Sequence, residues 1–217
     1  MKQAWILQGG WEGHEPDKTA PRFKKMLEDH GYQATIHQSL DCLADEQEIR
    51  KLDLVVACWT MGEIDREYSR NLSRAVGAGV GLAGCHGGMC DAFRESTEWQ
   101  FMTGGQWVAH PGNDGTPYIV NITNVKHEIT AGISDFSVRS EQYYMHVDPA
   151  VRVLATTRFP VADGPHVGNG PVDMPVVWTK VYGSGKVFYN SLGHHADVMA
   201  SEPCLTIMRR GFVWAAK

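Results

Sequence analysis

The chain lacks three features that would each define a broad class of protein. No apolar run approaches about 18 residues, the length that a membrane-spanning helix needs. No run or patch of lysine and arginine stands out, and the formal net charge is −5, so nucleic acid is a poor partner. The first apolar run stops at Gly9 and Gly10, too early for a signal peptide. These absences predict a cytoplasmic protein that binds neither membranes nor nucleic acids.

Cysteine pairs and nucleotide-binding motifs are also missing. The five cysteines are an odd number with no Cys-x-x-Cys pair, which favours reduced thiols over a disulfide framework. There is no GxxxxGK[ST], GxGxxG or His-Glu-x-x-His sequence, so the phosphate-binding loop, the dinucleotide fold and the zincin protease each lack their motif. We therefore expect no nucleotide cofactor.

Glycine and histidine are abundant instead, with 23 and 10 residues in a chain of 217. A chain of this length buries a core without disulfides or metals. No repeat or linker divides it, so we expect a single domain over residues 1–217. An acidic chain rich in histidine favours proton or metal chemistry. A homo-oligomer is compatible with this size, but nothing in the sequence locates an interface.

Alternating strand and helix patterns predict the fold class. The first half predicts strands at Ala4–Gln8, Tyr32–Gln38, Leu52–Trp59 and Gly79–Gly84, and helices at Asp17–Gly31, Asp45–Lys51 and Glu63–Gly77. The second half predicts strands at Tyr118–Thr123, Ala150–Thr156, Pro175–Lys180 and Lys186–Ser191, the last two as a hairpin, and a helix at Glu202–Ala215. Together these patterns predict an α/β fold with a doubly wound, mostly parallel sheet and helices on both faces.

The segment Gly84-Cys85-His86-Gly87-Gly88 follows a predicted buried strand. In a doubly wound sheet, ligands bind beyond the carboxyl ends of the strands. A glycine-flanked turn there lifts its central side chain into the pocket, and the helix that follows can hold an anion. The central residue is His86, which can serve as acid, base or metal ligand; the simpler alternative is a glycine turn with an incidental histidine. Cys85 is expected to point the other way, into the core.

Two later segments supply further polar groups. Glu141 and His146 lie within six residues of each other, and both suit proton transfer or metal binding. His194 and His195 are adjacent, so on an extended segment their side chains point to opposite faces. We assign His194 to the site because it follows Gly193 at a strand end.

Three groups of candidate residues result. The catalytic set is His86, Glu141 and His194. Ligand binding is assigned to residues near predicted strand ends and to aromatic residues near the polar groups, although a plain core position is at least as likely for Trp59: Gly10, Glu12, Trp59, Trp107, His110, Tyr143 and Tyr144. If a divalent metal such as zinc or manganese binds, the expected ligands are His14, His86 and His146. For His14, the alternative of a simple polar residue at a helix start explains the sequence equally well.

In their order and spacing these motifs resemble the ThuA-like (trehalose utilisation) family, a branch of the class I glutamine amidotransferase-like superfamily. The matching pieces cover nearly the whole chain: Gly13-His14-Glu15, Gly84 to Gly88, His110-Pro111, His127 to Ile133, Glu141 with Tyr143 and Tyr144, Pro175 to Thr179, and Tyr182 to His194. One departure is visible, because the family often reads His-Pro where this chain has His127-Glu128.

The resemblance implies a flavodoxin-like core, a pocket at the glycine turn and a small sugar as partner. True amidotransferases carry cysteine where this chain has His86, so a glutaminase is not expected. The family is linked to trehalose use alongside dehydrogenases that make 3-keto-sugars. The expected function is therefore acid–base chemistry on a 3-keto-disaccharide or related sugar, by isomerisation, epimerisation or elimination through an enediolate, with or without a metal. The alternatives are a catalytically silent sugar-binding or regulatory protein and a hydrolase that uses Cys85 or Cys90.

Overall fold

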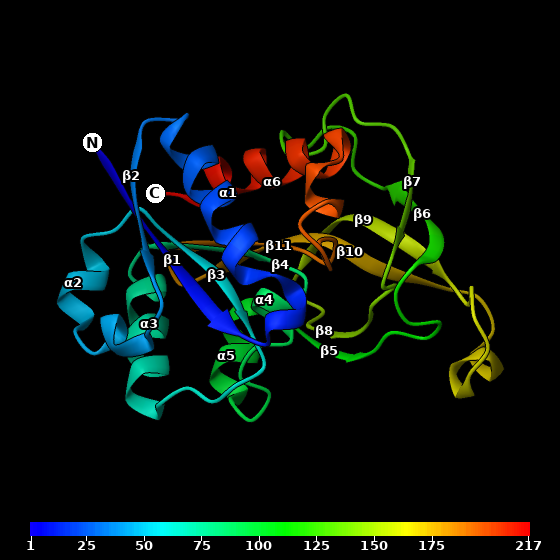
Figure 1. The fold of residues 1–217 in the computed structure, drawn as a ribbon, viewed down its shortest axis with the longest axis horizontal. Coiled ribbons are helices and arrows are strands. Elements are labelled where there is room, and N and C mark those ends of the chain that lie inside the picture. The colour runs from blue at the N-terminus through cyan, green and yellow to red at the C-terminus, as the bar shows by residue number, and fades with distance from the viewer.

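The apolar runs of the first half form the parallel part of a nine-stranded sheet in this computed structural model, which describes residues 1–217 (Figure 1). Five strands pair in parallel in the order β2-β1-β3-β4-β11. Helices cover β3 on both faces, which explains its continuous apolar sequence. The bounds are β1 (Lys2–Gly10), β2 (Tyr32–His37), β3 (Leu54–Thr60), β4 (Gly81–Cys85) and β11 (Gly185–Asn190).

The remaining strands of the large sheet are antiparallel. β11 is joined to β10 (Val172–Tyr182) by a tight turn, as predicted, and the sheet continues through β9 (Arg152–Phe159), β6 (Thr116–Ile122) and β7 (Phe136–Ser140). A tight turn can only reverse the chain, whereas a parallel pair needs a long crossover. The sheet is therefore mixed, and the expectation of a mostly parallel sheet is correct only for its first five strands. The flavodoxin-like arrangement stays a prediction.

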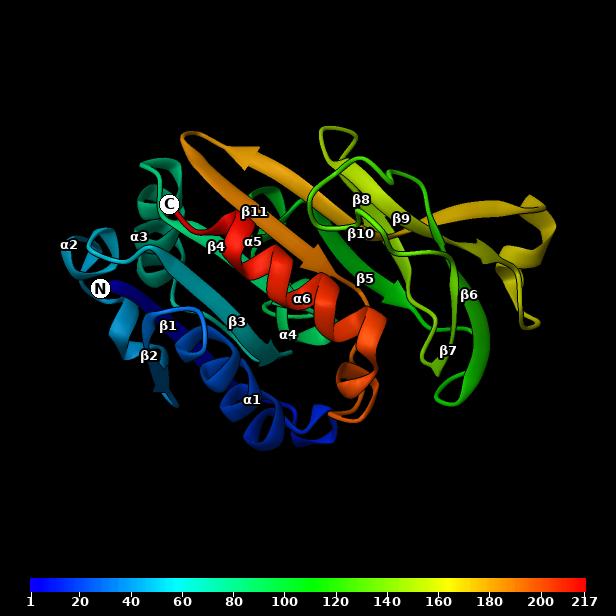
Figure 2. The ribbon, with the colours of Figure 1, turned by 90° about the horizontal axis from the view of Figure 1, so that it is seen from above.

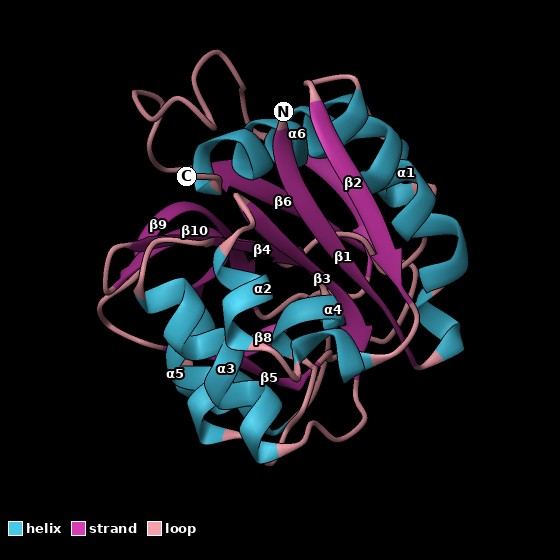
Figure 3. Cartoon of the chain, turned by 90° about the vertical axis from the view of Figure 1, so that its left-hand side faces the viewer, coloured by secondary structure: helices cyan, strands magenta, loops and turns pink.

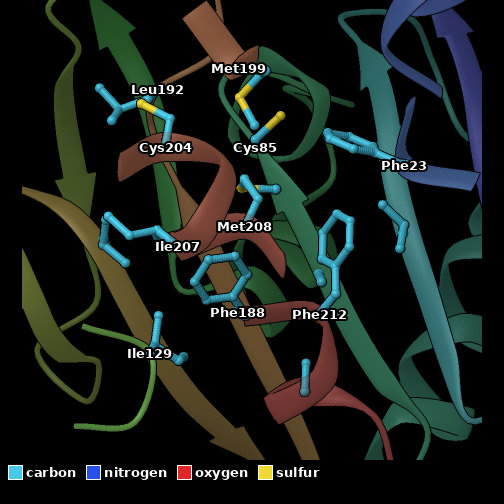
Figure 4. Close-up of a cluster of buried hydrophobic side chains, with 14 of the residues drawn as sticks. Phe23, Cys85, Ile129, Phe188, Leu192, Met199, Cys204, Ile207, Met208 and Phe212 are labelled. Atoms are coloured by element: carbon cyan, nitrogen blue, oxygen red, sulfur yellow. The ribbon is translucent and has the colours of Figure 1, made fainter. Parts of the chain in front are cut away.

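Helices lie on both faces of the sheet, as expected (Figure 3). α1 (Pro16–Glu28) and α6 (Glu202–Ala215) cover one face, and from above α6 lies over β4 and β11 (Figure 2). On this face Phe23, Phe188 and Phe212 pack in one buried cluster with Cys85 (Figure 4). The other face carries α2 (Glu46–Arg50), α3 (Arg66–Gly77) and α5 (Thr97–Thr103), with a second core around Trp99 and Trp178.

The helix expected after the glycine turn is the short α4 (Gly87–Cys90). Several other short elements have no counterpart in the predictions: β5 (Gly105–Ala109) pairs with β8 (Tyr144–Val147) in a separate two-stranded sheet. Four single-turn helices complete the chain: η1 (Glu12–His14), η2 (Leu40–Leu43), η3 (Pro165–Asn169) and η4 (Val198–Ala200). Such pieces are too short for hydrophobic periodicity to reveal. None of the helices combines the length and apolarity needed to cross a bilayer.

Candidate functional site

His86 stands at the turn between β4 and α4 with φ of 50° and ψ of −138°. This positive φ is strained for a residue with a side chain. The turn is held by its neighbours on β11: the backbone N–H of His86 donates to the Asn190 carbonyl at 2.7 Å, and the Tyr189 hydroxyl donates to the His86 carbonyl at 3.0 Å. The predicted glycine turn is confirmed, with His86 as its central residue.

Both ring nitrogens of His86 have neighbours. Nδ1 lies 2.8 Å from the Ser191 carbonyl oxygen, and Nε2 lies 3.1 Å from Oε2 of Glu141. The ring stacks on Tyr143 with 4.0 Å between centroids, and the whole residue is buried. The ring of His86 is therefore fixed in both position and orientation.

Glu141 lies between β7 and β8 and is buried. Its backbone carbonyl accepts a hydrogen bond from the Tyr118 hydroxyl at 3.0 Å. Besides His86, its Oε2 atom lies 3.2 Å from Nδ1 of His194 and 3.9 Å from Nε2 of His14, and its Oε1 atom lies 3.7 Å from Nε2 of His110. One carboxylate is thus surrounded by four imidazoles.

His14 and His194 reach the cluster from opposite ends of the chain. His14 ends η1, and its Nδ1 atom lies 2.9 Å from the Thr60 hydroxyl at the end of β3. A side chain on Gly87 would come within 2.6 Å of the His14 ring, so only glycine there leaves room for this ring. His194 follows Gly193, whose φ is 113°, and points inward, whereas His195 is partly exposed. The choice of His194 over His195 agrees with this placement.

The electrostatics of the cluster favour an ionised Glu141 carboxylate beside neutral His14 and His86 rings. Burial raises the pKa of Glu141, but the neighbouring imidazoles of His194 and His86 outweigh this effect and hold that pKa well below its usual range. Burial, together with the neighbouring His86 and His194, lowers the pKa of His14 to about 2. Burial also lowers the pKa of His86, although Glu141 opposes this.

The structure brings most of the predicted site residues to this cluster. His86, Glu141, His194 and His14 meet directly, and Tyr143 lies against His86. Trp107 is tilted over His110 with 5.4 Å between ring centroids, so both border the cluster. Gly10 ends β1 beside Thr60, where a side chain would strike the Thr60 carbonyl.

His146 requires a correction, because it does not join the other proposed metal ligands. It is exposed on β8, opposite Gln106, and borders a separate cleft with Phe101 and Asp148. Successive side chains of a strand point to opposite faces, and on β8 the inward position belongs to Met145.

Three predicted ligand-binding residues also lie away from the cluster. Tyr144 packs on Phe159 with 5.2 Å between ring centroids, because it points away from the side that Tyr143 faces. Trp59 packs beside Phe93, and Glu12 is exposed on η1. For Trp59, the core-packing alternative describes its surroundings best.

Three residues at the cluster were not predicted. Thr60 contacts His14, and Asp114 lies 3.9 Å from Nε2 of His194. Trp11 is 46% exposed and packs its ring edge-on against His14. Trp11 follows the Gly9-Gly10 turn and Thr60 follows the predicted strand Leu52–Trp59, so both positions could have been found, but nothing in the local sequence marks Asp114.

The cavity at the cluster is small, and a much wider cleft lies elsewhere on the molecule. A cavity of only about 10 Å³ lies behind His14 and His86, too small for a sugar. Around the cluster, the side chains of His110 and Asp114 are partly exposed, at 31% and 52%. A cleft of about 500 Å³ lies elsewhere, between α3 and α5, and is lined by charges of both signs, including Glu63, Arg66 and Glu98.

The cysteines are not placed for nucleophilic chemistry. Cys85 and Cys90 are buried, and desolvation raises the pKa of each thiol well above its usual value. Cys85 points into the core beside Met199 and Cys204, as predicted (Figure 4). Since the thiolate is the reactive form, these residues give no support to a cysteine-dependent hydrolase.

Comparison with known proteins identifies the family. The family model for ThuA, described as trehalose utilisation, matches residues 3–215. The chain belongs to the ThuA family. Membership implies a role in trehalose utilisation and so in carbohydrate metabolism. No curated protein matches the chain.

Solved structures share the fold at low sequence identity. A ThuA-like protein from Bacteroides uniformis superposes with a TM-score of 0.79 at 17% identity, covering 99% of this chain and 91% of the other. A ThuA-like protein from Parabacteroides merdae gives 0.77 at 18% identity, covering 99% and 90%. A β-galactosidase from Bacillus circulans sp. alkalophilus gives 0.65 at 11% identity, covering 99% of this chain but 30% of the enzyme. At these identities the likeness concerns the fold alone.

Proposed function

We propose that this ThuA protein is an enzyme that moves a proton on the carbon beside the ketone of a 3-keto-disaccharide or a related keto-sugar. The observation that carries the proposal is the buried Glu141 carboxylate with imidazoles on both of its oxygens. Such a concentration of proton-transfer groups is costly to bury, and groups of this kind gather at functional sites. The trehalose-utilisation family supplies the substrate class.

The chemistry needs a base and a positive centre. When the base removes the proton, the carbonyl oxygen takes the negative charge and an enediolate forms; reprotonation gives isomerisation or epimerisation, and loss of a leaving group gives elimination. In our proposal His110, the most exposed ring facing Glu141, exchanges the proton. His86 and His194 lie on the other oxygen of Glu141, on the side where the developing oxygen charge is to be stabilised.

Deuterium exchange tests this function without knowledge of the final product. The protein is incubated with 3-ketotrehalose in deuterium oxide, and proton NMR follows the signals of the carbons beside the ketone. We expect exchange in the wild type and a loss of about 100-fold or more in Glu141→Gln. His146→Ala, which changes a histidine outside the cluster, is the matched control and should exchange at the wild-type rate.

Two results would overturn the proposal. Exchange no faster than in buffer, with the sugar still bound, would make this a silent sugar-binding or regulatory protein. Equal exchange in wild type and Glu141→Gln would remove the cluster from the reaction.

A further inference from the structure

Three of the histidines around Glu141 use one ring nitrogen to contact a group outside the cluster. Nδ1 of His86 lies 2.8 Å from the Ser191 carbonyl, and Nδ1 of His14 lies 2.9 Å from the Thr60 hydroxyl. Nε2 of His194 faces the Asp114 carboxylate at 3.9 Å. A carbonyl oxygen only accepts hydrogen bonds, so Nδ1 of His86 carries the proton, and Nε2 of the neutral ring is a lone pair.

The inner nitrogens of the same rings converge on one oxygen. Nε2 of His86, Nδ1 of His194 and Nε2 of His14 lie 3.1, 3.2 and 3.9 Å from Oε2 of Glu141. With Nδ1 of His86 protonated, Nε2 of its neutral ring is an acceptor that faces another acceptor, Oε2 of Glu141, in a buried space. Nδ1 of His194 has no hydrogen-bond partner although its residue is only 5% exposed. The arrangement therefore lacks a positive charge at its centre.

Protons alone supply that charge poorly. The three ring centroids lie 4.6, 5.0 and 5.4 Å apart, so imidazolium ions at all three positions would repel one another across a medium of low dielectric constant. A single cation between the nitrogens and the carboxylate satisfies all four groups at once.

We infer that His14, His86, His194 and Glu141 form a binding site for one divalent transition-metal ion, with zinc the best match. Their ligand atoms all lie within 4.8 Å of one another. A tetrahedral zinc site with bonds of about 2.0–2.1 Å places its ligand atoms about 3.3 Å apart, which the contacts of His86 and His194 with Glu141 nearly reach. Nε2 of His14, at 3.9 Å from Oε2 of Glu141, has to move inward. Three imidazoles select against magnesium and calcium, which prefer oxygen ligands.

The outer contacts fit the same assignment. Metal-bound histidine commonly donates its other N–H to a carboxylate, a backbone carbonyl or a water, and this contact fixes the ring and its tautomer. The Ser191 carbonyl is such a group for His86 at 2.8 Å, and the Asp114 carboxylate lies 3.9 Å from Nε2 of His194, just beyond hydrogen-bonding distance. The role of the ion in catalysis rests on the proposed function: there it supplies the positive charge that stabilises the substrate oxygen. Metal binding itself does not depend on that function.

Elemental analysis and equilibrium dialysis test the site directly. Untagged protein is stripped with a chelator, dialysed against zinc or cobalt in separate experiments, and analysed for metal per chain. We expect about one ion per chain in the wild type, and binding weaker by about 100-fold or more in Glu141→Gln and His194→Ala. Thr60→Val should weaken binding by about 10–100-fold, because it removes only the outer contact of His14. His146→Ala and His166→Ala are matched controls that should bind like the wild type, since both lie outside the cluster.

A second measurement separates a ligand role from a folding role. The cobalt-loaded wild type should show the intense visible bands of four-coordinate cobalt, and these should be lost in Glu141→Gln while thermal unfolding of the metal-free proteins stays the same. Absence of stoichiometric zinc and cobalt in the wild type, or undiminished binding in both cluster variants, would overturn the inference.

The outcome is distinguishable from that of the proposed function. Zinc bound at the cluster without deuterium exchange in 3-ketotrehalose would keep the metal site and reject the activity. If protein dialysed against metal retains none and exchanges deuterium at the same rate as stripped protein, the activity is kept and the metal site is rejected.

Discussion

His110 faces one oxygen of Glu141 while His86 faces the other: Nε2 of His110 lies 3.7 Å from Oε1, and Nε2 of His86 lies 3.1 Å from Oε2. His110 lies between β5 and β6, and its side chain is 31% exposed, compared with 2% for that of His86. The two rings therefore differ in their access to a substrate, although they share one carboxylate.

This difference predicts that His110→Asn separates the chemistry from metal binding. We expect deuterium exchange in 3-ketotrehalose to fall by about 100-fold or more, because the exposed ring that exchanges the proton is removed. Zinc content should not change, since His110 is not among the inferred ligands. Exchange at the wild-type rate would show that another group removes the proton.

Backbone strain at His86 predicts an unusual order of stabilities. Its φ of 50° suits glycine better than alanine, while both substitutions remove the same imidazole contacts. We expect metal-free His86→Gly to be more stable than metal-free His86→Ala by about 1 kcal/mol. Urea unfolding with a chelator present measures this difference. An alanine variant at least as stable as the glycine variant would mean that the turn relaxes when the side chain is lost.

Trp11 is predicted to act as a platform for the sugar ring. It is 46% exposed beside His14, and Gly13 leaves room for its ring. Trp11→Ala should raise KM roughly 2–10-fold, equivalent to about 0.5–1.5 kcal/mol of aromatic contact, with little change in kcat. Steady-state kinetics on the keto-sugar checks this. Phe101→Ala is the control, because Phe101 is also an exposed aromatic residue, at 63%, but borders the cleft of His146. Similar KM increases in both variants would count against a specific role for Trp11.

Thiol chemistry should play no part in the activity. Cys85 and Cys90 are buried with raised pKa values, and the least buried cysteine, Cys42, has its pKa raised to about 11 by burial. We expect Cys85→Ala and Cys90→Ala to keep wild-type exchange rates. In native protein iodoacetamide should leave every cysteine except Cys42 unmodified, and mass spectrometry should show all five modified in urea. Loss of exchange in parallel with alkylation of Cys85 would contradict this.

The ion pair between Asp148 and Lys180 predicts a stability difference that depends on pH. Nζ of Lys180 is buried and lies 2.7 Å from Oδ2 of Asp148, and its hydrogen bond lowers the pKa of that carboxyl. A lowered pKa in the folded state stabilises the protein above the unfolded pKa of about 3.9, and this stabilisation is lost as the pH falls through the folded value.

Asp148→Asn should therefore lower the free energy of unfolding by about 1–3 kcal/mol at pH 7, because the buried ammonium loses its charged partner. The gap between wild type and variant should shrink below about pH 4. Urea titrations across this pH range measure it. Asp173→Asn, which disrupts the exposed pair with Arg158, is the control and should change stability little. If the difference in the free energy of unfolding between wild type and Asp148→Asn stays constant at low pH, it arises from packing of the side chain and not from its charge.

The sequence predicts much of the parallel half of the sheet because long apolar runs mark strands that are covered on both faces. It also predicts the β10–β11 hairpin, since the turn contains Gly183, which readily adopts the positive φ of 61° found there. The antiparallel half was less predictable. β7 has one exposed side at the edge of the sheet, and β5 and β8 form a separate pair, so their apolar patterns are short and weak.

Prediction of the site succeeded where glycine marks a strand end and failed where the answer depends on tertiary contacts. His86 and His194 both adjoin glycines that follow strands, so local sequence was enough to select them. His146 was selected for its closeness to Glu141 in sequence, but the register of β8 sends it outward. Asp114 meets His194 only because two loops come together in the folded chain, which no local pattern can reveal.

The four groups of the cluster come from four separate segments, at residues 14, 86, 141 and 194. They depend on both the parallel and the antiparallel parts of the sheet, so neither part carries the complete set. A proteolytic fragment that keeps one half of the sheet would have at most an incomplete cluster. Recovery of the site after denaturation therefore requires the whole chain to refold, because neither part of the sheet can form the site by itself.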